Sequence, residues 1–169
     1  MKLIHFPKTR FAELAARAGG ITQSAAIEGA LKGIESARPE SDATILNAIG
    51  AIEEILYAPD VGSNLSEANM HAILRHADQI VTLAGMFCYE QLDLAARSLC
   101  DLVDGLLNSG QSFVAPIDVH VRALRLMAPG STSPSRAEAD KVFEGLQKIL
   151  SHFKFISLSS VDKSLDVEP

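Results

Sequence analysis

Two stretches with helical spacing, joined by a short apolar break, constrain this chain more than any other feature. Between Arg75 and Leu107 apolar residues recur every three or four positions on both sides of a break at 85–89, which reads GMFCY. This spacing predicts an amphipathic helix on each side, because three- and four-residue steps place side chains on one helical face. The shortness of the break predicts that the two helices pack as an antiparallel hairpin.

The rest of the chain repeats this helical pattern. We expect an all-α fold: an antiparallel four-helix-bundle-like domain with extra N-terminal helices, made of five main helices plus one or two short ones. No long stretch alternates apolar and polar residues as a half-buried strand would. The expected helices, with ends set by capping residues, glycines and prolines, cover residues 9–17, 23–37, 42–57, 64–85, 90–108, 116–128 and 136–153.

The first 39 residues are expected to hold two helices joined by a glycine turn. Gly19 and Gly20 end the first helix, and Thr22 caps the second. Pro39 is predicted to end the second helix, because proline cannot donate the backbone hydrogen bond that would continue it. The residues expected on the apolar side of each helix are Phe11, Leu14 and Ala15 in the first, and Ile27, Ala30, Leu31 and Ile34 in the second.

Three further helix starts carry local signals. Asn64 followed by Glu67 has the spacing of an N-cap and its acid, and Ser135 with Glu138 forms a capping box. Pro116 suits the first turn of a helix, where its missing N–H is not needed. These signals place the starts of the helices expected at 64, 116 and 136.

Length and composition suit one globular unit. The chain has 169 residues, of which 47% are hydrophobic and 21% charged, and this balance is typical of a folded chain rather than a disordered one. We therefore expect a single helical-bundle domain over residues 1–155. Residues 156–169 lose the helical period and are expected to form a loosely ordered tail.

Charge and cysteine content exclude several classes of function. The net charge is −6 and the basic residues are scattered, so binding to a nucleic acid is not expected. No apolar run reaches the roughly 18 residues needed to span a membrane, and the N-terminus has no signal-peptide pattern. Two cysteines in a chain of this length suit a reducing compartment, so the sequence predicts a cytoplasmic protein.

Residues with catalytic or metal-binding chemistry are sparse. The five histidines include no pair four residues apart, and neither HExxH nor CxxC occurs, so we expect no metal and no cofactor. Cys88 and Cys100 are interpreted as small buried hydrophobes rather than nucleophiles. Asp104 and Asn108 lie one turn apart, and such a pair can position an attacking water, as in some response-regulator phosphatases. The alternative for this pair is an ordinary solvated helix face.

One polar stripe on the helix expected at 64–85 is a candidate binding face. His71, Arg75, Asp78 and Thr82 are spaced four, three and four residues apart, so all four should face solvent or a partner. An exposed imidazole can accept a phosphoryl group, and a cation one turn away can hold the phosphoryl oxygens. His71 is thus a candidate phosphoacceptor. The alternative is that the four residues form an ordinary polar stripe on the protein surface.

The break and the helix after it resemble the histidine phosphotransfer domains of bacterial two-component signalling. The resemblance rests on Ala84 to Leu92, AGMFCYEQL, followed by AARSL at 95–99, and covers about 35 of the 169 residues. It implies a four-helix bundle whose active-site helix precedes an AGTFG-like turn. It also implies a receiver domain or a histidine kinase as the partner.

The chain departs from this family at the reactive position. In the family the phosphorylated histidine precedes the phenylalanine of the turn by about nine residues, and nine residues before Phe87 lies Asp78. The Lys-Gly pair of the family falls on Val81 and Thr82, while His76 and His71 lie two and seven residues too early. The resemblance therefore predicts a module that binds its partner without phosphotransfer.

Three functions follow from these patterns. The first is a signalling and interaction module that binds a receiver domain or kinase through His71, Arg75, Asp78 and Thr82. The second is a structural or oligomerisation bundle without chemistry, which would form a homodimer. The third is an enzyme, a response-regulator phosphatase that uses Asp104 and Asn108; the sequence favours an enzyme least.

Overall fold

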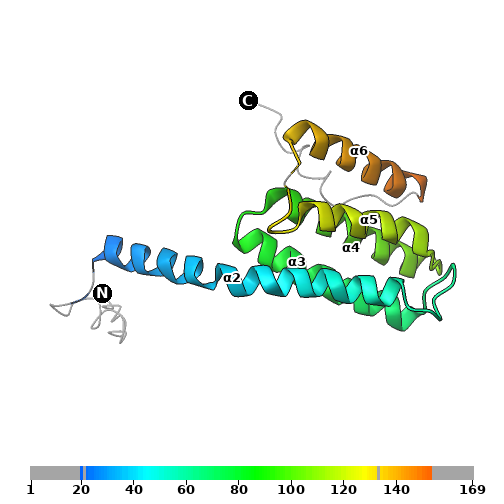
Figure 1. Ribbon diagram of the computed structural model, residues 1–169, viewed down its shortest axis with the longest axis horizontal. Coiled ribbons are helices and arrows are strands. Elements are labelled where there is room, and N and C mark those ends of the chain that lie inside the picture. The colour runs from blue at the N-terminus through cyan, green and yellow to red at the C-terminus, as the bar shows by residue number, and fades with distance from the viewer. Residues whose placement is uncertain (1–19, 21, 133, 154–169) are drawn as a thin grey trace, which may run out of the picture. The chain divides into compact units, whose positions relative to one another are not determined.

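Five α-helices make up the regular structure of the part of the chain that the structure describes. This computed structural model describes residues 20, 22–132 and 134–153. Within these ranges no strand forms beyond an isolated bridge between Asn64 and Phe113, so the all-α prediction is confirmed. The helices are α2 (Gln23–Leu56), α3 (Glu67–Met86), α4 (Glu90–Asn108), α5 (Val114–Met127) and α6 (Arg136–His152) (Figure 1).

The chain divides into two compact units. We call Met1–Arg38 the N-terminal unit and Pro39–Pro169 the bundle unit. Helix α2 begins in the first and ends in the second. The bundle unit contains the hydrophobic core, to which all five helices contribute. The expected helix at 9–17 and the expected tail at 156–169 lie outside the described residues.

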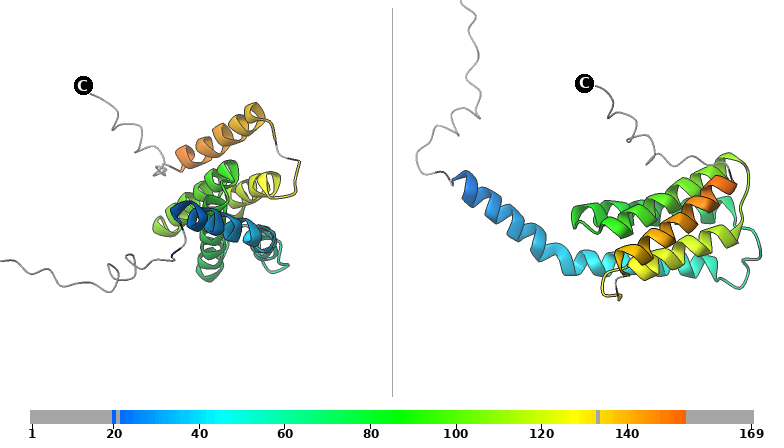
Figure 2. Two further views of the ribbon diagram at one scale, coloured as in Figure 1. Left: turned by 90° about the vertical axis from the view of Figure 1, so that its left-hand side faces the viewer. Right: turned by 90° about the horizontal axis from the view of Figure 1, so that it is seen from above.

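Helix α4 is the central element of the bundle unit. It packs against α3, α5 and α6, and Figure 2 shows α6 crossing on the outside of α4 and α5. Apolar residues fill three or four positions in every two turns, which gives α4 a face wide enough for several neighbours. Its buried residues are Leu92, Ala95, Ala96, Ser98, Leu99, Leu102, Val103 and Leu106.

The turn between α3 and α4 is fixed by a buried ring and a bond to α2. Phe87 is buried, and the hydroxyl of Tyr89 donates to a carboxylate oxygen of Asp42 at 2.7 Å. Cys88 lies between them with φ 57°, in the left-handed region that non-glycine residues rarely adopt. Hydrogen bonds from the N–H of Phe87 to the carbonyl of Leu83 and from Tyr89 to Ala84 close the turn. The short apolar break therefore forms the predicted hairpin connection.

Polar contacts join the C-terminal half of α2 to α5. The guanidinium of Arg125 forms a two-pronged ion pair with Glu53, in which Nε lies 3.0 Å from Oε1. The hydroxyl of Tyr57 donates to Asp118 at 2.5 Å, and Asp118 also accepts from Arg122 at 2.9 Å. Surface pairs of this kind add little stability, commonly below about 1 kcal/mol. Their main effect is to fix the register of α2 along α5.

The predicted helix break at Pro39 was wrong. Helix α2 continues through Pro39, so the helices expected at 23–37 and 42–57 are one. Proline cannot donate to the carbonyl of Glu35, but a helix can survive the loss of one bond when its flanking turns are favourable. The turns after Pro39 are held by burial of the apolar residues that begin at Ile45. Pro39 is nevertheless the first residue of the bundle unit.

The predicted cap at Asn64 was also wrong. Helix α3 begins at Glu67 with Ser66 as its N-cap, whose hydroxyl accepts from the N–H of Asn69 at 3.1 Å. Residues 63–65 instead bond to the loop before α5: Leu65 donates to Ser112 and Val114 donates to Ser63. A pairing with a segment distant in the sequence thus overrides a local capping pattern.

Two other helices begin where predicted, and a third begins two residues earlier. Ser135 and Glu138 form both bonds of the capping box at the start of α6, and α4 has the predicted bounds. Helix α5 begins at Val114 rather than at 116, with Pro116 in its first turn as expected. No helix within the described residues is long and apolar enough to cross a membrane.

A matched pair of truncations on α4 tests its central position. Leu99 is fully buried, whereas Leu94 is 47% exposed on the same helix. We expect Leu99→Ala to lower the free energy of unfolding by roughly 2–5 kcal/mol, because it removes packed apolar volume and leaves a cavity. Leu94→Ala should cost less than about 1 kcal/mol, because a half-exposed side chain loses little packing. Urea unfolding measures both, and equal losses would contradict the packing described here.

Candidate functional site

The four residues of the predicted binding stripe are all exposed on α3. His71, Arg75, Asp78 and Thr82 share the helix with a buried stripe that fixes the opposite face. That stripe packs mainly against α4, so the orientation of the outer face follows from the burial of the inner one. Its residues are Met70, Ile73, Ala77, Ile80 and Ala84.

The four side chains of the stripe differ in the contacts that they make. The His71 ring is 58% exposed and its Nε2 lies 3.7 Å from Oε1 of Glu67, one turn earlier. The guanidinium of Arg75 has no ion-pair partner among the described residues. The hydroxyl of Thr82 donates to the backbone carbonyl of Asp78 at 2.9 Å, as threonine commonly does within a helix. His71 and Arg75 are therefore the members of the stripe best placed to meet a partner.

Asp78 is engaged with α4. The thiol of Cys100 donates to Oδ1 of Asp78 across 3.6 Å. Burial, with the nearby negative charge of Asp78, raises the pKa of Cys100 to about 12. The thiol therefore stays protonated near neutral pH, which makes it a poor nucleophile. The contact joins residues that lie 22 positions apart, and no local spacing rule could have found it.

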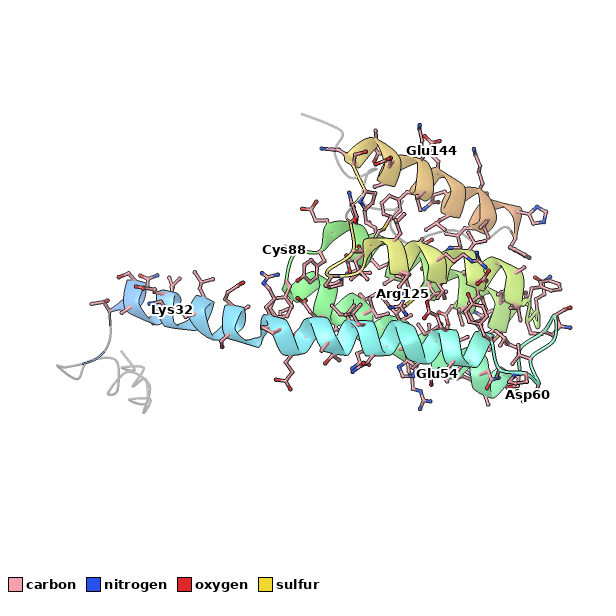
Figure 3. The ribbon with its side chains drawn as sticks, viewed as in Figure 1. Lys32, Glu54, Asp60, Cys88, Arg125 and Glu144 are labelled. Carbon is pink, nitrogen blue, oxygen red and sulfur yellow. The ribbon has the colours of Figure 1, made fainter. Side chains whose placement is uncertain are left out.

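The two cysteines differ from each other in exposure. Both were interpreted as buried, but Cys88 is exposed and only Cys100 is partly buried. Figure 3 labels Cys88 at the turn between α3 and α4. Its positive φ directs the chain around the turn while the neighbouring ring of Phe87 takes the interior position. The apolar appearance of the break therefore misled the interpretation of Cys88.

The pair considered for phosphatase chemistry is exposed. Asp104 and Asn108 both lie on the outer side of α4, and Asn108 is its last residue. Among the described residues no group of three histidine, cysteine or acidic side chains could hold a metal ion.

A buried serine–histidine pair was missed by the sequence analysis. The ring of His120 on α5 is fully buried, and its Nδ1 lies 2.8 Å from the carbonyl oxygen of Pro116. A carbonyl can only accept, so Nδ1 carries the hydrogen. Burial lowers the pKa of His120 to about 4, so the ring is neutral near pH 7. Its Nε2 then accepts from the hydroxyl of Ser98 on α4, at 3.0 Å.

This pair has a structural role. Both residues are buried, so a substrate could not reach the serine hydroxyl without opening the helix packing. The two hydrogen bonds satisfy polar groups that would be costly to bury alone. The spacing of Ser98 within an apolar stripe gave no signal, because only the fold brings His120 beside it.

Comparisons with family models, curated proteins and solved structures found no match to this chain.

The buried histidine predicts a specific pH dependence of stability. Unfolded His120 titrates near pH 6.5, while the folded ring titrates near 4, so only the unfolded chain binds the proton between these values. Stability should therefore be complete above pH 6.5 and fall as the pH drops towards 4, by roughly 3 kcal/mol from this group. Urea unfolding between pH 7 and 4.5 measures the slope.

Two variants separate His120 from the exposed histidines. His120→Met should remove most of the slope above pH 4.5, although it also lowers stability at pH 7. His71→Gln should keep the slope, since this ring is exposed. An unchanged slope in His120→Met would show that another group causes the acid sensitivity.

Proposed function

We propose that this chain is an interaction module similar to histidine phosphotransfer domains, which binds a receiver domain or kinase without passing phosphate. The observation that carries the proposal is the outer face of α3, where His71 and Arg75 lie one turn apart and exposed. Neither residue is needed by the core. A helix face with a cation and an imidazole complements a negatively charged surface on a partner.

Asp78 supports the absence of phosphotransfer. Within the resemblance it occupies the position of the phosphorylated histidine, and it holds the thiol of Cys100. A carboxylate there repels an incoming aspartyl phosphate and cannot form a phosphohistidine. Binding would then depend on the surrounding side chains of α3 rather than on a reacting atom.

A charge reversal on α3 tests the binding face. Arg75→Glu should weaken binding to a receiver domain from the same genome by about tenfold or more, because it replaces a charge that complements a negative partner surface with one that repels it. Lys148→Glu, an equal charge change at an exposed position of α6, should change the affinity less than about twofold. Isothermal titration calorimetry with purified domains measures both. Equal affinities for the two variants would remove the α3 face from consideration.

Phosphate transfer is tested in a mixture of this chain, the receiver domain and a histidine kinase. Incubation with a kinase and labelled ATP should leave this chain unlabelled while the receiver domain becomes labelled. An acid-labile label on this chain, lost in His71→Gln, would contradict the proposal and identify His71 as a phosphoacceptor.

Self-association is a second candidate function. Val119 and Leu126 are seven residues apart on α5, and both are exposed apolar side chains. Two exposed apolar side chains along α5 would suit packing against a second copy of the chain in an oligomerisation bundle. Light scattering would then show a dimer that Leu126→Glu converts to a monomer, whereas a monomer at all concentrations would exclude this function.

A further inference from the structure

The N-terminal unit carries an exposed apolar face. In α2 the side chains of Ile27, Leu31 and Ile34 are 52%, 62% and 44% exposed, and they are spaced four and three residues apart. This spacing aligns them on one side of the helix. A single exposed leucine is ordinary on a protein surface, but three large aliphatic side chains in one row indicate a missing neighbour.

We propose that residues 9–17 of the same chain cover this face as the first helix of a hairpin. Those residues lie outside the described part of the chain, and their sequence carries a matching apolar side: Phe11, Leu14 and Ala15. The proposal is independent of the function proposed for α3. It assigns the α2 face to an intramolecular contact.

The start of α2 fits a tight hairpin. The hydroxyl of Thr22 accepts from the N–H of Ala25 at 3.3 Å, and its carbonyl accepts from Ala26 at 2.9 Å. Thr22 therefore caps α2 two residues after Gly20. The pair Gly19 and Gly20 provides the conformational freedom for a chain reversal. A connection this short makes successive helices antiparallel neighbours.

The two apolar sides match in length and register. A helix of nine residues is about 13 Å long, while Ile27 and Ile34 are separated by about 10 Å along α2. Counted from Gly20, the middle of the connection, Leu14 lies six residues away and Ile27 seven. In the same way, Phe11 lies nine residues away and Ala30 ten. The apolar residues of both segments are therefore level to within one residue, or about 1.5 Å along a helix axis.

Connectivity favours this segment over a second copy. The exposed acids beside the apolar face, Glu28 and Glu35, already pair with Lys32 and Arg38, so charge does not decide between the two. The segment is tethered a few residues away from the face, which gives it a high effective concentration there.

Thiol accessibility in the full chain tests the contact. A single reporter, Leu31→Cys, is placed in a Cys88→Ser, Cys100→Ala background, and circular dichroism checks that the helices remain. Ser36→Cys is the matched control, because position 36 lies nine residues from Ile27 and about 180° around the helix. The rate of labelling by a maleimide dye is measured at several protein concentrations.

The proposal predicts that the reporter at 31 labels at least about tenfold more slowly than the control at 36, independently of protein concentration. Adding Phe11→Asp and Leu14→Asp should restore fast labelling at 31 and leave 36 unchanged. Equal rates at the two positions would overturn the proposal. Protection that grows with protein concentration and survives the double substitution would overturn it as well and would assign the face to a second copy.

Discussion

Burial of the broad apolar face of α4 against α3, α5 and α6 is the interaction on which the rest of the bundle unit depends. The face orients α3, because the inner stripe of α3 must meet it. It also brings Ser98 beside the ring of His120, which closes the contact with α5 through neutral hydrogen bonds. Without α4 the inner stripe of α3 would lose the helix against which it mainly packs.

This packing has a consequence for function. The interior is filled by aliphatic side chains, and the buried histidine and the partly buried thiol have pKa values shifted away from reactivity. The accessible reactive groups include His71 and Arg75 on the outer face of α3 and Cys88 in the turn before α4. A protein built in this way is suited to present a rigid face to a partner. The proposed binding role follows from that distribution of exposed groups.

Sequence patterns predicted the elements well where local chemistry decides the outcome. The capping box at Ser135 depends on neighbouring residues alone, and the spacing of apolar residues predicted the bounds of α4. The continuity of α2 through Pro39 was missed, because core burial after Ile45 decides it. The exposure of the α3 stripe followed from periodicity, whereas the bond between Cys100 and Asp78 needed the fold. Partner binding without phosphotransfer remains a proposal that rests on the resemblance and on the exposed face of α3.

Hydrogen exchange of the full chain tests the central position of α4 most directly. Backbone amides of a helix that is packed on every side exchange only when the whole bundle unfolds cooperatively. We predict that the amides of α4 between Ala95 and Leu106 exchange most slowly, at rates set by global unfolding. Faster exchange in α4 than in α6, with protection concentrated elsewhere, would contradict it.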